Sequence, residues 1–538
     1  MIKIFSQLRA SIERRIEPDS VKGYFEIQKT NPDLINEIKN EIANQQIKIK
    51  RSPIENLIFP KSIDIQLSFH QYLFSTLLGA MFNRVILFNI YRKNKIIYPL
   101  PREWLRIVEK KGLSVSVFWS SFFYFLFTIA CFFSSLQSLA SHLLLNKKRV
   151  NTNQKYVYFL NLDQKCFPPL REKNHYDIMS WYTKKYKLNN PDDTRQIFHS
   201  AANVSDTLLE EHNIFFTQDN FPKIDFFNFF FKFFPAVILS LLAIILSFRL
   251  RNIILFKEIV DMYAFKFADK NRIAEKYFFN YSNLLYRPLW TYIAESKGSK
   301  LIWYFYSCHI SNYKVLNQKD FTVTDFFQIL NWPKYLVWNE HHAQYVRELI
   351  RYPAEIEVVG PIGFLDNSVS VPKITKPSVV LFDIQPFKLT YSIPASCGQW
   401  YKYDYQVRVD FFNDIESICS DLGVNVYFKR KRNNPRVHKD YLDFIKEFVK
   451  NDNVFEIDTG VSAFRLCKNF DVVLSMPFTA PSVIAAYFGK EAAYYDPTGT
   501  IQKDDRAAHN LIVINGKIEL REYLHNLFKN NNMESYED

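Results

Sequence analysis

Two long apolar stretches dominate the hydropathy pattern of the first half of the chain. Residues 112–146 contain no Asp, Glu, Lys or Arg, and they are long enough to cross a bilayer, which takes about 20 apolar residues. Residues 226–248 are interrupted by Lys232 and Pro235, so their uninterrupted apolar part is shorter. Basic residues flank both stretches and give no orientation. A spanning hairpin, an interfacial or re-entrant pair and two buried core helices all fit this pattern, and membrane contact is the favoured interpretation.

From about residue 252 onward, short β-branched and aromatic runs alternate with helical patterns, which is typical of a parallel sheet. An earlier strand-like run, YVYFLNLD at residues 156–163, predicts the opening strand of the same domain. The further elements predicted before residue 361 are helices over 257–286 and 341–349 and strands over 301–307, 335–339 and 355–361.

Three prolines and small polar residues in the segment 360–378 predict a linker between domains. A second block of roughly six strands alternating with helices follows it. We therefore predict an α/β fold of two Rossmann-like domains facing a cleft, with a helical hydrophobic N-terminal extension and insertions. The predicted units are the N-terminal extension (1–150), the first Rossmann-like domain (151–365) and the second (378–538).

Composition and charge narrow the function classes. Hydrophobic residues make up 48% and charged residues 23% of the chain, which excludes wholesale disorder. The net charge of +13 suits nucleic acid, anionic lipid or phosphorylated small molecules, but no zinc finger or RNA-binding motif occurs. The six cysteines are scattered, which predicts reduced thiols and neither a disulfide framework nor a zinc site. The N-terminus shows no signal-peptide pattern, so we expect no secretion.

One loop of the second block is a candidate anion site. A predicted strand over 471–476 leads into the sequence SMPFTAPS, where Thr479 is expected to N-cap a helix that stops at Gly489. The free backbone N–H groups of such a helix start bind anions, although an ordinary capped turn is the alternative. No GxGxxG or GxxxxGK[ST] pattern occurs, so nicotinamide and P-loop sites lose support. The candidate phosphate-binding residues of this loop are Ser475, Phe478, Thr479 and Ser482.

Four consecutive cations leave the end of another predicted strand, VNVYF. Alternation along the strand aims Lys429 and Lys431 to one side and Arg430 and Arg432 to the other. One pair could clamp a diphosphate while the other is solvated, and a wholly solvated face is the alternative.

Several segments of the second block carry a family resemblance. FDIQPF, VYFKRKR, FRLCKNFDVVLSMPFT, AAYYDPTG and QKDDRAAH resemble the polysaccharide biosynthesis PFTS motif proteins, as do the earlier WTYIAESKGSK, YLVWNE and EVVGPIG. The resemblance covers roughly residues 290–528, and nothing before it matches. The name-giving motif ends here in Ala480, so its fourth hydroxyl is missing, and Ser482 could substitute.

This resemblance implies a GT-B fold and transfer of a sugar from a nucleotide-activated donor to a growing bacterial surface glycan. The first domain would then bind the acceptor and the second the donor. The basic block and the PFTA loop would hold the donor phosphates. The residues that could contact ribose, base or sugar hydroxyls are Asp458, Asp496, Lys503 and Asp504, with an exposed loop as the alternative for Asp504.

A general base is expected from the first domain, where Glu340 and His341 follow a predicted strand. No acidic pattern demands a metal, so we expect metal-independent transfer, no metal site and no cofactor. The expected partners are a nucleotide sugar, a glycan or lipid-linked glycan acceptor and membrane lipids, without nucleic acid. The expected location is the cytoplasmic side of a bacterial inner membrane, peripheral or anchored. Two alternatives stay open: a polymer glycerophosphate-type transferase on the same fold, and a non-catalytic membrane-bound assembly protein.

Overall fold

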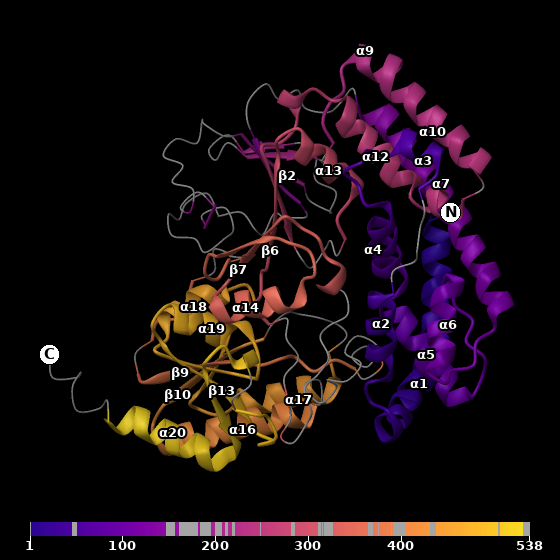
Figure 1. Cartoon of the computed structure of the whole chain (residues 1–538). Coiled ribbons are helices and arrows are strands. Elements are labelled where there is room, and N and C mark those ends of the chain that lie inside the picture. The colour runs from indigo at the N-terminus through magenta and orange to yellow at the C-terminus, as the bar shows by residue number, and fades with distance from the viewer. Residues whose placement is uncertain are drawn as a thin grey trace.

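A computed structural model gives the structure of the protein (Figure 1). The residues that it describes are 2–45, 51–146, 156–160, 181–182, 185, 195–199, 207–209, 214–217, 221–247, 249–280, 286–309, 314, 316, 327–363, 370–374, 376–388, 390, 405–430, 437–503 and 506–530.

The N-terminal extension is a layer of helices that packs beside the first sheet. Its long helix α1 lies against α5, and Gly23 of α1 comes so close that a Cβ there would collide with the backbone carbonyl of Leu87. Only a glycine allows this approach. The helices of the layer are α1 (Ile2–Thr30), α2 (Leu34–Asn44), α3 (Pro53–Ile58), α4 (Ile65–Leu77), α5 (Ala80–Arg92) and α6 (Arg102–Lys110).

The two apolar stretches form helices that leave many large hydrophobic side chains exposed. The first is α7 (Val117–Leu145), and the second comprises α9 (Phe226–Asn228), a π-helical turn η4 (Phe229–Phe233) and α10 (Phe234–Ser247). Both are long and apolar enough to cross a membrane. The buried positions of α7 are polar (Ser120, Thr128, Ser135 and His142), whereas its exposed side chains include Phe118, Trp119, Phe122, Phe123, Phe125 and Phe133. This inverted pattern contradicts the alternative of a buried core helix.

The first sheet has the strand order β3-β4-β2-β1-β5-β6-β7-β8, and all its pairs are parallel except β3–β4. Its strands are β1 (Tyr156–Phe159), β2 (Arg195–His199), β3 (Thr207–Leu209), β4 (Ile214–Thr217), β5 (Lys276–Asn280), β6 (Lys300–Tyr304), β7 (Lys334–Val337) and β8 (Glu355–Val358). The helices of this part are α11 (Leu250–Ile254), α12 (Phe256–Phe267), α13 (Leu289–Ser296) and α14 (Glu340–Leu349), with 3-10 turns η5 (Lys270–Arg272) and η6 (Phe327–Ile329).

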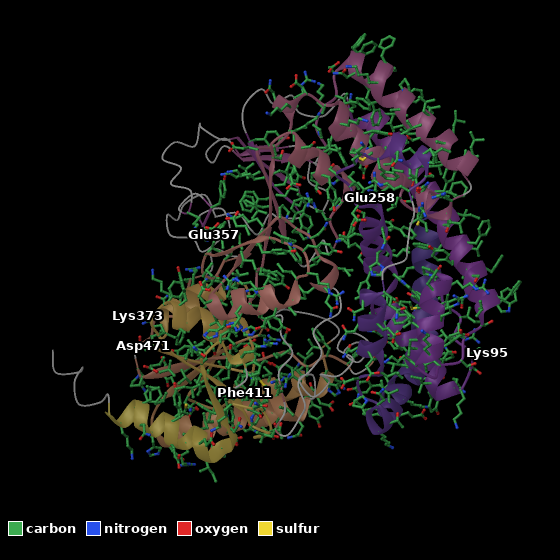
Figure 2. All side chains as sticks on the ribbon, viewed as in Figure 1. Lys95, Glu258, Glu357, Lys373, Phe411 and Asp471 are labelled. Carbon is green, nitrogen blue, oxygen red and sulfur yellow. The ribbon has the colours of Figure 1, made fainter. Side chains whose placement is uncertain are left out.

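Helix α12 joins the apolar helices to this sheet. It contacts α7, α10 and α13. Its buried Glu258, labelled in Figure 2, accepts hydrogen bonds from Tyr286 Oη (3.0 Å) and from the backbone N–H of Leu289 (3.2 Å). The two apolar helices and the first domain therefore share one continuous core.

The helix predicted over residues 257–286 is wrong in its second half. Helix α12 ends at Phe267, and the sequence KYFFN forms β5 between β1 and β6. Its Tyr277, Phe278 and Phe279 are fully buried. Aromatic side chains suit a pleated, covered strand, and this tertiary burial overrides the apparent helical period.

The second sheet is wholly parallel, with the order β11-β10-β9-β12-β13-β14. Its strands are β9 (Ser378–Phe382), β10 (Asn425–Lys429), β11 (Val454–Ile457), β12 (Val472–Ser475), β13 (Glu491–Asp496) and β14 (Ile512–Asn515). Its helices are α16 (Tyr405–Asp421), α17 (Lys439–Phe448), α18 (Ala463–Asn469), α19 (Ala480–Tyr487) and α20 (Gly516–Asn530), with the 3-10 turn η8 (Arg506–Ala508).

The carboxyl edges of the two sheets face each other, as Figure 1 shows for the region of α14, α18 and α19. Trp338, just after β7, packs on Phe464 of α18 with ring centroids 6.4 Å apart. The backbone N–H of Leu316 donates to the Thr500 carbonyl (2.8 Å). The predicted fold class, two Rossmann-like domains in a GT-B-like arrangement with a hydrophobic helical extension, is confirmed. The assignment of acceptor and donor roles to the two domains stays a prediction.

One buried carboxylate ties the N-terminal helices to the chain beyond the apolar helices. Glu55 of α3 is fully buried and accepts hydrogen bonds from Arg249 Nη1 (3.0 Å) and Arg251 Nε (2.8 Å). It also closes the capping box of α3 by accepting the Ser52 backbone N–H (2.8 Å). A buried carboxylate is stable only when it is paired in this way.

We expect Glu55→Ala to lower the free energy of unfolding by about 3–5 kcal/mol, because it leaves Arg251 largely buried without its counter-charge. Thermal unfolding of the purified protein measures this loss. Glu447→Ala removes an exposed carboxylate paired with Lys450 (2.6 Å) and should change the stability by no more than about 0.5 kcal/mol. Equal effects of the two substitutions would contradict the structural role of Glu55.

Candidate functional site

The PFTA loop connects β12 to α19 at the carboxyl edge of the second sheet. Thr479 occupies the N-cap position, but its Oγ1 donates to the Met476 carbonyl (2.9 Å) and makes no cap bond. Backbone N–H groups in the first turn of α19 have no intrahelical acceptor, as at every helix start. Anion binding at this helix start stays a prediction.

The serine hydroxyls of this loop are engaged inside the fold. Ser475 and Ser482 are fully buried, and their Oγ atoms lie 2.5 Å apart. Ser482 Oγ also donates to the Ala493 carbonyl (3.0 Å), so it links α19 to β12 and β13. Phe478 is buried as well, with its ring against Tyr494 (5.1 Å between centroids). These three predicted ligands therefore support the loop from within.

The strand register places Lys429 on the same face of the sheet as the PFTA loop. Phe428 pairs with Leu381, so Lys429 is level with Phe382, and Ser475 pairs with Phe382 from the other side. Two strand spacings, about 10 Å, therefore separate the backbones of Lys429 and Ser475. Because side chains alternate along a strand, Lys429 lies on the same face of the sheet as Tyr427. Tyr427 belongs to a hydrophobic cluster that also contains residues of α18 and α19. Lys429 and the start of α19 thus converge.

Arg430 lies on the opposite face. It is paired with Glu456 of β11 and lines a hollow of about 420 Å³ together with Lys439 and Asp443 of α17. The two faces separate Lys429 from Arg430 as the alternation predicted. Lys431, Arg432 and Asp504 lie outside the described residues.

Three further predicted donor contacts have partners of their own. Asp496 is buried at the end of β13 and accepts the backbone N–H groups of Thr498 (3.0 Å), Thr500 (2.8 Å) and Ile501 (2.9 Å). Asp458 is exposed and accepts the Gly460 N–H (2.6 Å). Lys503 is exposed and pairs with Glu519 of α20 (2.6 Å). Asp496 therefore shapes the loop that carries Thr500 toward the first domain.

The predicted bases stand across the interface, at the start of α14. Glu340 is exposed and 3.8 Å from Arg347, whereas His341 is half-buried with its ring 6.4 Å from that of His509. The neighbouring His342 is buried, and its Nδ1 accepts the Trp338 N–H (3.3 Å). Burial, with a contribution from His509, lowers the pKa of His342 well below its usual value, so this ring is neutral at pH 7.

Sequence reasoning missed a histidine-rich cluster between the domains. Cys308 and His309 follow β6, and His509 follows η8 in the second domain. One ligand atom from each of these three residues lies within 4.8 Å of the others. Burial, with the nearby His341, lowers the pKa of His509 to about 4. The available signal was the position of Cys308 and His309 directly after a predicted strand, together with His509 in the segment QKDDRAAH.

A family model described as "Polysaccharide biosynthesis PFTS motif protein" matches residues 238–524, just over half of the chain. The chain belongs to this family. The match to the PFTS motif family begins inside α10, upstream of residue 290, and it includes both the PFTA loop and the interdomain cluster. No curated protein matches the sequence of this PFTS motif protein.

Solved structures with a similar arrangement share little sequence with this PFTS motif protein. Spinosyn forosaminyltransferase SpnP shows 11% identity and a TM-score of 0.36, covering 70% of this chain and 91% of its own. A UDP-glucosyltransferase from Polygonum tinctorium shows 9% identity and a TM-score of 0.33, and the match covers 70% of this chain and 90% of that one. The α,α-trehalose 6-phosphate synthase from Burkholderia multivorans shows 7% identity and a TM-score of 0.36, and the match covers 69% of this chain and 90% of that one. Such low scores say nothing about the donor or the acceptor.

We expect Ser482→Ala in this PFTS motif protein to cost about 1–3 kcal/mol of stability, because Ser475 Oγ and the Ala493 carbonyl lose their buried partner. Differential scanning calorimetry of the purified chain measures the loss. Ser420→Ala changes an exposed serine of α16 and should leave the unfolding temperature nearly unchanged. A stable Ser482→Ala variant would show that the hydroxyl does not support the loop.

Proposed function

We propose that the protein is a glycosyltransferase that moves a sugar from a nucleotide-activated donor to a bacterial surface polysaccharide. The single observation that carries this proposal is the convergence of Lys429 and the start of α19 at the carboxyl edge of a parallel sheet. Ligands of open α/β sheets bind at that edge. Membership of the PFTS motif family supports polysaccharide synthesis as the setting.

The donor phosphates would lie between Lys429 and the first turn of α19. The ammonium group of Lys429 supplies the positive charge, and the backbone N–H groups supply directed hydrogen bonds. The proposed transfer uses neither a cofactor nor a metal on the phosphates.

On the acceptor side we assign the general base to His341. It stands at the start of α14 after β7, half-buried and directed at the second domain's His509. A histidine suits this role because its ordinary pKa lies near neutrality. Glu340 is the second candidate, and it is less favoured because it is exposed and lies 3.8 Å from Arg347.

The test compares two neighbouring cations on opposite faces of one strand. Lys429→Gln should weaken the binding of a nucleoside diphosphate by about 10- to 150-fold, the value of a lost charged contact to phosphate. Arg430→Gln is the matched control and should leave the affinity nearly unchanged, since Arg430 pairs with Glu456 on the other face. Isothermal titration of UDP, GDP, CDP and CMP against both variants gives these values.

Each outcome of this comparison selects a function. Equal affinities of wild type and Lys429→Gln would contradict the donor site. When the titration is extended to CDP-linked polyols and nucleotide sugars, binding of the polyol donors alone would favour the glycerophosphate-type transferase. Failure of wild type to bind any nucleotide would favour a non-catalytic assembly protein.

We further propose that α7 and the α9–α10 segment contact membrane lipids, with the second domain on the cytoplasmic side. The exposed apolar side chains of both helices support lipid as their surroundings, because exposing such a large apolar surface to water is energetically unfavourable. Cys131, Cys308, Cys419 and Cys467 are free thiols, which fits a reducing compartment.

A spectroscopic label tests this contact. A fluorophore attached at Phe133→Cys or Leu242→Cys, both about half exposed, should be quenched by lipids that carry spin labels on their acyl chains. The same fluorophore at Ile518→Cys, on the exposed surface of α20, should not be quenched. Equal quenching at all three positions would contradict the proposed orientation.

A further inference from the structure

We propose that Cys308, His309 and His509 bind a divalent transition-metal ion of the zinc type, which bridges the two domains. The three side chains each offer one ligand atom within 4.8 Å of the others, and this is the only group of three potential ligands found among the described residues. Cys308 and His509 are buried, and His309 is partly buried. A thiol and two imidazoles form the ligand set that Zn²⁺ prefers.

The hydrogen bonds around His509 leave its metal-binding nitrogen available. Its Nδ1 lies 3.1 Å from Asn339 Oδ1. The same oxygen accepts the backbone N–H of His342 (2.9 Å), which identifies it as the acceptor atom. Nδ1 of His509 is therefore the donor, and the lone pair of the neutral ring is on Nε2. That atom is buried without a hydrogen-bond partner. Histidine ligands to metals are oriented by an outer hydrogen bond of this kind.

A similar contact orients His309. Tyr494 Oη donates its single proton to the Thr479 carbonyl (3.2 Å) and lies 3.4 Å from His309 Nε2. His309 Nε2 is then the donor to the phenolic oxygen, so the lone pair of this ring is on Nδ1. Through Tyr494, the proposed site also connects to the carbonyl of the N-cap residue of α19.

The neighbouring His342 does not complete the set. Its Nδ1 accepts the Trp338 N–H, so its proton is on Nε2 and no lone pair remains for a metal. Three protein ligands leave a fourth coordination position, as in zinc sites that accept water or another small ligand. His509 also adopts a left-handed backbone with φ of 54°, which is uncommon for a residue with a side chain. The fold holds this ring toward the first domain despite that cost.

This site differs from the proposed phosphate clamp and does not depend on sugar transfer. It departs from the sequence-based expectation that the cysteines form no zinc site. Its ligands come from both domains, so the ion would hold the two carboxyl edges in contact. Metal binding to residues of one folded arrangement stabilises that arrangement.

The experiment uses the purified full chain, stripped with a chelator and titrated with Co²⁺ as a spectroscopic probe. Wild type should bind one Co²⁺ with a thiolate charge-transfer band, and Zn²⁺ should displace it. Cys308→Ser should lose that band, and Cys419→Ser, a buried cysteine elsewhere, should retain it. His509→Gln should weaken Co²⁺ binding by at least about 100-fold, more than is typical for loss of an outer partner.

A second measurement covers the case in which Cys308→Ser fails to fold. Zn²⁺ should raise the unfolding temperature of the wild type and should not raise that of His509→Gln. Absence of a charge-transfer band in the wild type, or equal Co²⁺ affinity in the wild type and His509→Gln, would overturn the proposal. Both readouts are independent of nucleotide binding, so failure of the metal site and failure of the proposed transferase can be told apart.

Discussion

Parallel strand pairing is the constraint on which the rest of the structure depends. Because the strands of each sheet run in one direction, apart from β3, the residues that follow them gather at a single edge. The two sheets turn these edges toward each other, so His309 and Asn339 of the first domain meet Tyr494 and His509 of the second. The same constraint brings Lys429 beside the start of α19. The residues of each group are far apart in the sequence, and the register of the strands brings them together.

How much of the site the sequence predicts depends on where each polar group finds its partner. The position of the PFTA loop and the opposite directions of Lys429 and Arg430 follow from strand alternation alone. The roles of Ser482 and Asp496 do not, because their partners are backbone groups of β13 and of the following loop. A sequence shows that a hydroxyl or carboxylate is present after a strand. Whether it serves a ligand or its own loop is decided by contacts that only the fold creates.

The fold itself was predictable where hydrophobic runs alternate cleanly. In the second domain six strands alternate with helices, as predicted, because each strand is a short apolar run between polar turns. The prediction failed at β5, whose aromatic residues match the composition of the helix before it. It also gave no account of the packed helices α1 to α6, whose core forms between elements distant in sequence, such as α1 and α5.

The inverted faces of α7 show why the membrane question needed the structure. Ser120, Thr128, Ser135 and His142 recur at intervals of seven or eight residues, about two helical turns, so they form one polar stripe. In the sequence this stripe could face water, with the phenylalanines inside. The structure places the stripe against the protein, where Ser138 Oγ (3.1 Å) and His142 Nε2 (2.9 Å) both reach Asp261 of α12. The exposed phenylalanines of α7 are Phe118, Phe122, Phe123, Phe125 and Phe133. Because α12 also packs on α13, the surface that orients the apolar helices is fixed to the first domain, while the facing sheet edges lie between the two domains, near α14, α18 and α19 (Figure 1).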